Sequence, residues 1–208
     1  MKAQKLCADT TIITKFIFEI TKDWLNAPDQ GEKFEIRCLG EQRTPVTECF
    51  TQDAIDRAVE LAFRMNQKKM NVYVTINPVN PDAVIKAGKG ATDSDILRAH
   101  YSFADADDLQ GLDGLNTLAG LVEPDIIVTT GTIPHERRHA YWRLRKPCQD
   151  LHLWRETQKL IAFKLETDPS VRNPSRIMRV AGTVSYPSKS KLTRGYVPEL
   201  VTLKVRNT

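Results

Sequence analysis

The sequence predicts an α/β domain of the α+β kind, because stretches with apolar residues at helical spacing alternate with stretches patterned like strands. Its 208 residues, 41% of them hydrophobic, can bury one substantial core. No apolar run approaches the ~20 residues that span a bilayer, and the first residues show no secretory pattern. We therefore expect a single cytoplasmic domain that does not associate with a membrane.

The N-terminal elements follow from these patterns. Ile13, Phe16 and Ile20 are spaced as on one face of a helix. Thr51 is of the residue type that caps a helix, and apolar residues recur at helical spacing after it. Glycines and lysines without periodicity mark residues 81–93 as a loop. The expected elements are a helix at 11–25, a strand at 34–39, a helix at 51–66 and a strand at 72–76.

The rest of the chain alternates in the same way. The expected elements are strands at 100–104, 125–128 and 140–144, helices at 112–121 and 149–165, and turns with short strands at 176–206. Lys146-Pro147 is expected to end the third of these strands, because proline cannot donate to a sheet ladder. No internal repeat or low-complexity tract interrupts the pattern.

Charge is distributed unevenly along the chain. Residues 137–208 hold sixteen Lys and Arg against five Asp and Glu, a net charge of +11, and residues 1–136 carry −7. A strongly basic half indicates a polyanionic partner. The alternative is that these basic residues only solvate exposed faces.

Two aspartates follow the strand expected at 100–104. Side chains at i and i+2 on a strand point to the same face, so Asp105 and Asp107 are expected to lie together. Carboxylate oxygens are ligands for divalent cations, and a pair of such ions can activate a hydroxyl and stabilise a leaving phosphate. The alternative is a solvated acidic turn, and Asp108 is either a spare carboxylate or a turn residue.

Residues 135–139, HERRH, match the zinc-protease pattern H-E-x-x-H. That chemistry needs both histidines on one helix face, with a third ligand such as His152 or Glu156. The residues that follow, 140–144, are aromatic and alternate, which favours a strand with His139 at its start. The pattern is therefore interpreted as a coincidence. Cys7, Cys38, Cys49 and Cys148 show no C-x-x-C pairing that would indicate zinc or disulfides.

An ordered set of motifs extends over about residues 70–201. It consists of FADADD at 103–108, Thr130-Gly131, the strand HAYWRL at 139–144, Asp168 and the R-x-x-R-x-x-G-T segment at 176–185. With these motifs the chain resembles the archaeo-eukaryotic primase (AEP) superfamily, especially the RepB-like primases and primase-polymerases of phages and plasmids. Two positions depart from the family's pattern, since Arg137 stands where serine is expected and Ser185 where asparagine is expected.

This resemblance implies a primase-type catalytic core with an RRM-like antiparallel sheet plus an N-terminal α/β unit. Residues 1–80 would form the N-terminal unit, and residues 81–208 the metal-bearing core and basic C-terminal part of one catalytic domain. The implied activity is DNA-directed nucleotidyl transfer, which makes short RNA or DNA chains from nucleoside triphosphates. The implied cofactor is Mg²⁺ or Mn²⁺, and the implied partners are nucleoside triphosphates, a single-stranded DNA template and a replicative helicase.

The resemblance also implies roles for individual residues. The metal-binding, catalytic carboxylates would be Asp105, Asp107 and Asp168, with His139 as a catalytic contact to the nucleotide phosphates. Further nucleotide or phosphate contacts would be Arg137, Arg179, Lys189 and Lys191, and contacts to nucleic acid would be Arg138, Arg176 and Arg194. Tyr141 and Trp142 could stack on bases or pack in the core.

Two other functions stay open at this level. A replication initiator module that grips nucleic acid without catalysis would also use the basic half of the chain. A zinc metalloprotease would use His135, Glu136 and His139.

Overall fold

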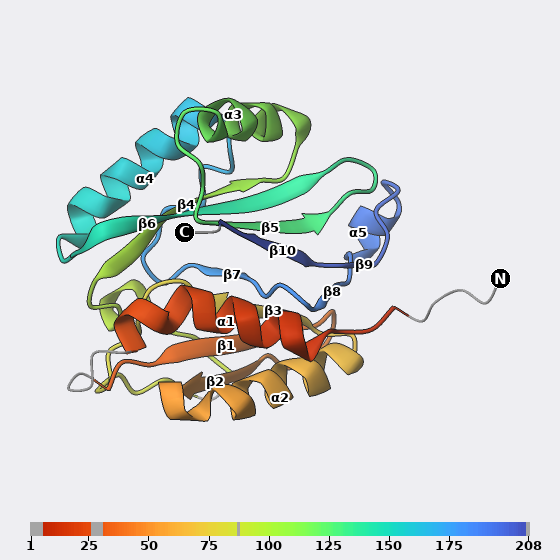
Figure 1. The fold of residues 1–208 in the computed structure, drawn as a ribbon. Coiled ribbons are helices and arrows are strands. Elements are labelled where there is room, and N and C mark those ends of the chain that lie inside the picture. Colours follow the sequence, from red (N-terminus) through yellow and green to blue (C-terminus); the bar gives the residue numbers. More distant parts are fainter. Residues whose placement is uncertain (1–5, 26–30, 87, 207–208) are drawn as a thin grey trace.

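Two four-stranded antiparallel sheets carry the fold (Figure 1). The structure is a computed structural model and describes residues 6–25, 31–86 and 88–206. The N-terminal sheet contains, in spatial order, β2 (Val46–Phe50), β1 (Phe34–Leu39), β3 (Asn71–Thr75) and β7 (Ile177–Arg179). The second sheet contains β10 (Thr202–Val205), β5 (Ile126–Gly131), β6 (Arg137–Cys148) and β4 (Ala99–Ala106). The mixed α/β class that the sequence predicts is confirmed.

The first predicted helix is present as α1 (Thr10–Leu25). Asp9 caps it, because its Oδ1 accepts hydrogen bonds from the backbone N–H groups of Thr11 at 2.9 Å and Ile12 at 3.1 Å. Phe16 and Ile20 are fully buried, as their helical spacing indicates.

The second helix starts differently from the prediction. A 3-10 turn, η1 (Gln52–Ala54), leads into α2 (Ile55–Gln67). The hydroxyl of Thr51 donates to Asp53 Oδ1 at 2.5 Å and caps no backbone N–H. The prediction of Thr51 as a helix cap was wrong, because a nearby carboxylate engages its hydroxyl. The strand β2 was not predicted at all, since its partly exposed side chains show no apolar alternation.

The long strands of the second sheet extend further than the sequence predicts. β4 continues to Ala106, and β6 runs past Pro147 to Cys148. The register moves from Tyr101 opposite Arg143 to Ala99 opposite Cys148, so β6 carries extra residues in this stretch. Proline is tolerated at such an irregularity, because a ladder hydrogen bond is already missing there. The prediction that Lys146-Pro147 ends the strand was therefore wrong.

Helices α3 (Leu109–Ala119) and α4 (Leu151–Leu165) cover one face of the second sheet (Figure 1). Ala104, Ala106 and Ala140 of this face form a buried cluster with Leu115 of α3 and Leu165 of α4. Small residues on the strands let the two helices approach the sheet closely. A further 3-10 turn, η2 (Asp93–Asp95), lies before β4. No helix in the described ranges is long and apolar enough to cross a membrane.

The opposite face of the second sheet carries aromatic side chains and packs against α1. The hydroxyl of Tyr101 donates to the carbonyl oxygen of Glu19 in α1 at 3.0 Å. The ring centres of Tyr141 and Phe16 are 6.2 Å apart. These two contacts fix α1 against the sheet. They lie away from the Asp105 end of β4, where a site can form.

The two sheets are not built from consecutive parts of the chain. β7, from the C-terminal part of the chain, is the fourth strand of the N-terminal sheet, and one buried core contains residues from both sheets. The short pair β8 (Val184–Ser185) and β9 (Glu199–Leu200) and the helix α5 (Lys189–Leu192) follow. The boundary at residue 80 between an N-terminal unit and the rest stays a prediction.

Asn66, at the end of α2, ties this C-terminal part of the chain to α2. Its Nδ2 donates to the carbonyl oxygens of Val184 at 2.9 Å and Met70 at 3.0 Å, and its Oδ1 accepts from the backbone N–H of Val184 at 2.8 Å. The side chain is buried. Losing it would leave buried backbone groups without partners, which is costly.

We therefore expect Asn66→Ala to lower the free energy of unfolding by about 2–4 kcal/mol, because several buried hydrogen bonds are lost together. Thermal denaturation would show this as a decrease of roughly 5–15 °C in Tm for a domain of this size. The matched control is Gln67→Ala, the exposed neighbour at the end of the same helix, for which we expect almost no change. Equal Tm values for both variants would contradict this role of Asn66.

Candidate active site

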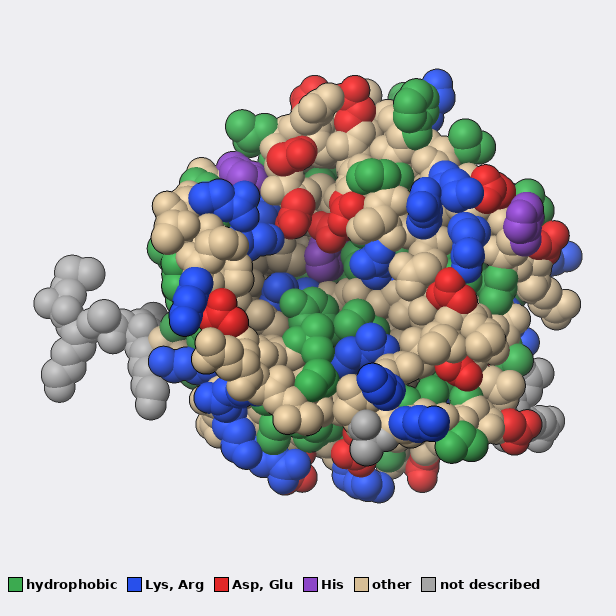
Figure 2. Space-filling view, turned by 180° about the vertical axis from the view of Figure 1, so that it is seen from behind, with side chains coloured by type: hydrophobic (Ala, Val, Ile, Leu, Met, Phe, Trp, Pro, Cys, Tyr) green, Lys and Arg blue, Asp and Glu red, His purple; other side chains and the backbone are tan. Residues whose placement is uncertain are grey.

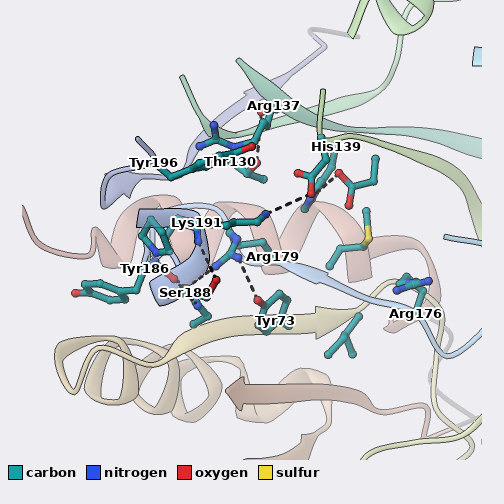
Figure 3. Close-up of a pocket in the computed structure, with 17 residues that line it drawn as sticks. Tyr73, Thr130, Arg137, His139, Arg176, Arg179, Tyr186, Ser188, Lys191 and Tyr196 are labelled. Atoms are coloured by element: carbon teal, nitrogen blue, oxygen red, sulfur yellow. Dashed lines mark hydrogen bonds and ion pairs between the residues drawn. The ribbon is translucent and has the colours of Figure 1, made fainter. Parts of the chain in front are cut away.

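A pocket of about 330 Å³ lies between the two sheets (Figure 3). Its walls come from β3, β4, β6, β7 and the segment around α5. Figure 2 shows it as a hollow with acidic side chains and a histidine on one side and Lys and Arg side chains around it. The ionisable residues that line it are Asp105, Asp107, Arg137, His139, Arg176, Arg179 and Lys191.

The pairing of β4 with β6 sets the acidic side of the pocket. Asp105 is the register partner of His139, and Asp105 Oδ1 lies 3.6 Å from His139 Nε2. Asp107 follows on the same face and also lines the pocket, as the i, i+2 spacing predicts. Asp108 instead caps α3, where its Oδ1 accepts from the backbone N–H of Gly111 at 2.8 Å. Asp108 is thus a structural residue and not a spare carboxylate.

The Asp105 carboxyl is in an unfavourable environment for a charge. Burial, together with the negative charges of Asp107 and Asp168, raises the pKa of Asp105 to about 8. Its Oδ1 is buried and has no hydrogen-bond partner among the described residues. A buried, unpartnered carboxylate oxygen beside other carboxylates is the donor set that oxygen-preferring divalent cations take.

Asp168 lies next to this pair without joining it through its side chain. Its backbone N–H donates to the carbonyl oxygen of Asp105 at 3.0 Å. Its own carboxylate accepts from the backbone N–H and the hydroxyl of Ser170, both at 2.8 Å. Within the described residues, no three His, Cys, Asp or Glu side chains are grouped closely enough to hold a metal ion. The three predicted carboxylates are therefore neighbours, but only two of them line the pocket.

His139 is an uncharged hydrogen-bonding group. Burial and the positive charges of Arg179 and Arg176 lower the pKa of His139 to about 3. The 3.6 Å approach between His139 Nε2 and Asp105 Oδ1 is therefore not an ion pair, because the imidazole ring is in its neutral form. The Nδ1 of His139 lies 3.2 Å from the hydroxyl of Tyr141. If that hydroxyl donates to Nδ1, the proton of the ring is on Nε2, which faces the carboxylates.

The H-E-x-x-H interpretation is excluded by the backbone. His139 lies inside strand β6, and His135 and Glu136 precede that strand, so the two histidines do not share a helix face. His135 Nε2 contacts the carbonyl oxygen of Asp107 at 2.9 Å, and Glu136 Oε1 accepts from Arg138 Nε at 2.9 Å. Glu156, one suggested third ligand, is paired with Lys159 on α4.

Two arginines of β7 and the turn before it form the wall opposite the carboxylates (Figure 3). Arg179 donates to Asn71 Oδ1 at 2.6 Å and to the hydroxyl of Tyr73 at 3.1 Å, and its Cζ lies 4.9 Å from the Tyr73 ring centre. Arg176 donates to the carbonyl oxygen of Ser170. These contacts hold two guanidinium groups at the pocket wall, where they can meet an anion.

The α5 segment adds one further cation to the pocket. Lys191 Nζ lies 3.4 Å from Asp107 Oδ2 and 5.4 Å from the Tyr196 ring centre. Lys189 and Arg194 are exposed and do not line the pocket. Arg194 instead packs over the Tyr196 ring, with its Cζ 5.3 Å from the ring centre. Of the three predicted cations in this segment, the structure brings Lys191 to the carboxylates.

Arg137 and Arg138 point in different directions. Arg137 lines the pocket but is 5% exposed and donates to the carbonyl oxygens of Ile133 and His135, both at 2.9 Å. It also pairs with Glu199 Oε2 at 3.2 Å. Arg138 lies on the α3 side of the sheet, where its NH1 donates to Asn116 Oδ1 at 3.0 Å. The structure thus separates Arg138 from the other predicted site residues.

The aromatic residues after His139 belong to the core. Tyr141 is fully buried, and Trp142 Nε1 donates to the carbonyl oxygen of Val122 at 3.0 Å. The pocket contains other aromatic and polar residues that the sequence did not indicate, namely Asn71, Tyr73, Tyr186, Ser188 and Tyr196. No local motif marks them; Asn71, for example, binds the backbone of Tyr186, 115 residues away.

Comparisons with known proteins place this fold in a structural class. No family model matches the sequence, and no curated protein sequence matches it. Solved structures of AEP-type primase domains match the fold along nearly the whole chain. The chain therefore has the fold of an AEP-type primase domain.

The similar structures are primases. The AEP domain of the cyanophage S-2L primase-polymerase has a TM-score of 0.64 and 19% identity, and the match covers 96% of this chain and 91% of that one. A crystal structure of primase RepB' has a TM-score of 0.57 and 16% identity, over 92% of this chain and 56% of that one. The catalytic domain of primase RepB' in complex with initiator DNA has a TM-score of 0.55 and 15% identity, over 94% of this chain and 85% of that one.

The raised pKa of Asp105 leads to a stability prediction. An unfolded carboxyl titrates near pH ~4, so a folded pKa of about 8 means that the folded state loses stability as pH rises between these values. Without divalent cations, Asp105→Asn is expected to raise the Tm at pH 8 by at least about 2–4 °C, with a smaller difference at pH 5. Thermal unfolding in a chelator measures this. The control is Asp113→Asn, on exposed α3 surface. A pH-independent difference for Asp105→Asn would contradict the prediction.

Proposed function

We propose that the chain is a DNA primase or primase-polymerase, which joins nucleoside triphosphates on a nucleic-acid template. The observation that carries this proposal is the meeting of two carboxylates, Asp105 and Asp107, with three cations, Arg176, Arg179 and Lys191, in one pocket of an AEP-type fold. Nucleotidyl transfer needs this combination, because it brings together a triphosphate and an attacking hydroxyl.

The carboxylates are the proposed holders of Mg²⁺ or Mn²⁺. The buried, unpartnered Oδ1 of Asp105 fits this role, and Asp107 and Asp168 are near enough to raise the pKa of Asp105. When bound, such ions supply activation of the 3′-hydroxyl and neutralisation of phosphate charge. Asp168 is the proposed third ligand, because its backbone hydrogen bond to Asp105 keeps it beside the pair.

The chain's own cations and His139 are the proposed phosphate contacts. Neutral His139, with its proton on Nε2, can donate a hydrogen bond to a phosphate oxygen. Arg176, Arg179 and Lys191 surround the same space and supply positive charge. Arg137 contributes differently, because its guanidinium is already occupied by Glu199 and two carbonyl oxygens. It holds the turn between β5 and β6 at the edge of the pocket.

The partners follow from the same chemistry. We propose single-stranded DNA as the template, supported by the net charge of +11 on residues 137–208. One similar structure is a primase catalytic domain in complex with initiator DNA. Phage, plasmid or mobile-element replication in the cytoplasm, alongside a replicative helicase, is the proposed setting.

A non-catalytic initiator module that binds nucleic acid is the second candidate. It is favoured by the hydrogen bonds that occupy the Asp168 carboxylate and by the missing three-residue metal cluster among the described residues. Such a module would bind single-stranded DNA in a salt-sensitive way and would incorporate no nucleotide. Primer synthesis with labelled nucleotide on a single-stranded template therefore separates the two candidates.

Substituting the acidic residues tests the primase proposal. Asp105→Ala and Asp107→Ala are each expected to reduce incorporation of NTPs and dNTPs by at least about 100-fold, because charge stabilisation at the phosphates is lost. Asp168→Asn is expected to act similarly. Asp113→Asn serves as the control, and Tm values no lower than that of the wild type exclude unfolding. Full incorporation by the Asp105 and Asp107 variants, with Mg²⁺ or Mn²⁺, would contradict the assignment.

The hydroxyl of Tyr141 gives a separate prediction. Tyr141→Phe removes the hydrogen bond that orients the His139 ring, and we expect the KM for nucleotide to rise on the order of tenfold, the equivalent of one hydrogen bond. Tyr101→Phe is the matched control, because that buried hydroxyl lies on the same sheet face but bonds to Glu19 of α1. Nitrogen-15 NMR of the ring should show a changed tautomer ratio in Tyr141→Phe. An unchanged ratio with unchanged KM would remove Tyr141 from the site.

A further inference from the structure

A second pocket adjoins the candidate active site. It has a volume of about 430 Å³ and lies next to the segment Tyr186–Ser188. Asn71 and all three residues of this segment line both pockets, so the segment forms a ridge between them. The β1–β2 turn and the end of α2 bring Arg43 and Lys69 to the second pocket.

The ridge is fixed in place by one side chain. Asn71 Nδ2 donates to the carbonyl oxygen of Tyr186 at 2.9 Å, and Asn71 Oδ1 accepts from the backbone N–H of Tyr186 at 2.8 Å. The same Oδ1 accepts from Arg179 at 2.6 Å. The ridge and the arginine of the first pocket therefore share one anchor. In Figure 3 the ring of Tyr186 points away from His139 and Arg179.

Two cations of the second pocket are placed by unusual backbone conformations. Lys69 has φ +59°, and Gln42, next to Arg43, has φ +58°. Glycine or asparagine is the ordinary residue at such positions, and other residues there cost about 1 kcal/mol. Both side chains of interest are exposed. A lysine kept where glycine would be more stable points to a role for its charge.

We propose that single-stranded nucleic acid crosses the ridge from the active-site pocket and that Arg43 and Lys69 bind its phosphates in the second pocket. This inference rests on the proposed function, since it assigns a path to the strand that a primase handles. Phosphodiester groups match the two cations, and the Tyr186 ring between the pockets offers a stacking surface for a base. Glu41 is the acidic residue that lines the second pocket. Its carboxylate is engaged by the ridge side, because Oε1 accepts from the backbone N–H of Lys189 at 3.2 Å.

Cations line both pockets, on either side of the ridge. One strand that crosses the ridge can therefore place phosphates against cations in each pocket. Arg179 and Lys191 line the first pocket, and Arg43 and Lys69 line the second. Figure 2 shows Lys and Arg side chains continuing along the molecule below and to the left of the hollow. A free nucleotide would need one pocket, whereas a strand uses both and the ridge between them.

Lys69→Gly and Arg43→Gln test this path. Each is expected to weaken binding of a 15–20-nucleotide single-stranded DNA by about 3–10-fold, and to reduce the slope of log affinity against log salt by about 0.7 for each lost phosphate contact. Lys69→Gly also relieves the positive φ, so its Tm should be equal to or above that of the wild type. The matched control is Lys164→Gln, an exposed lysine of α4 outside both pockets.

Binding is measured by fluorescence anisotropy without nucleotide or divalent cation, so it does not depend on catalysis. Weaker DNA binding by both variants supports the path for the template even if the wild type incorporates nothing, a result that would refute only the primase function. Unchanged DNA binding with shorter products in the synthesis assay would assign the path to the product strand. Unchanged binding and product length, or a loss restricted to free nucleotide, would overturn the proposal.

Discussion

The antiparallel pairing of β4 with β6 is the constraint on which the candidate site depends. Its register sets Asp105 opposite His139 and also sets Ala104 opposite Ala140. The first pair faces the pocket, and the second pair faces the apolar cluster under α3 and α4. A slip of one residue would turn the carboxylate into that cluster and the alanines into the pocket. The packing of α3 and α4 on this sheet therefore also orients the acidic residues toward the pocket.

Electrostatics in the pocket follows from the same burial. Removing Asp105 and His139 from water shifts their pKa values in opposite directions, in each case toward the uncharged form of the side chain. The surrounding cations, Arg176 and Arg179, lower the pKa of His139 further. The pocket without ligands thus holds unmatched positive charge on one wall and protonated or crowded carboxylates on the other. A triphosphate and a divalent cation would satisfy both walls at once, which is why the stability of the folded chain and its proposed ligands are coupled.

Local periodicity predicted most of the helices and strands. It also predicts which of the adjacent basic residues before His139 can face the pocket. If His139 faces the pocket from a strand, Arg138 must face away, because neighbouring side chains on a strand alternate. The motif comparison grouped Arg138 with the nucleic-acid contacts, and the structure places it against Asn116 of α3. Arg137 obeys the alternation, yet Glu199, sixty-two residues away, occupies its guanidinium. Contacts of that range are set by partners that no local pattern reveals.

Two asparagines, on α2 and β3, hold part of the pocket wall in place. Asn66 and Asn71 each use both atoms of the amide to bind the backbone of one residue, Val184 and Tyr186 respectively. Their side-chain amides make the kind of hydrogen bonds to the backbone that a neighbouring strand would make. In this way they hold Ser185, which lies between Val184 and Tyr186, at the pocket wall. The sequence shows serine here where the family pattern has asparagine. The two amides hold the backbone on either side of this position, so the place of the segment does not depend on which of these two residues stands there. The N-terminal sheet therefore acts as the support that places the C-terminal segment over the carboxylates, and the two parts of the chain form the pocket only together.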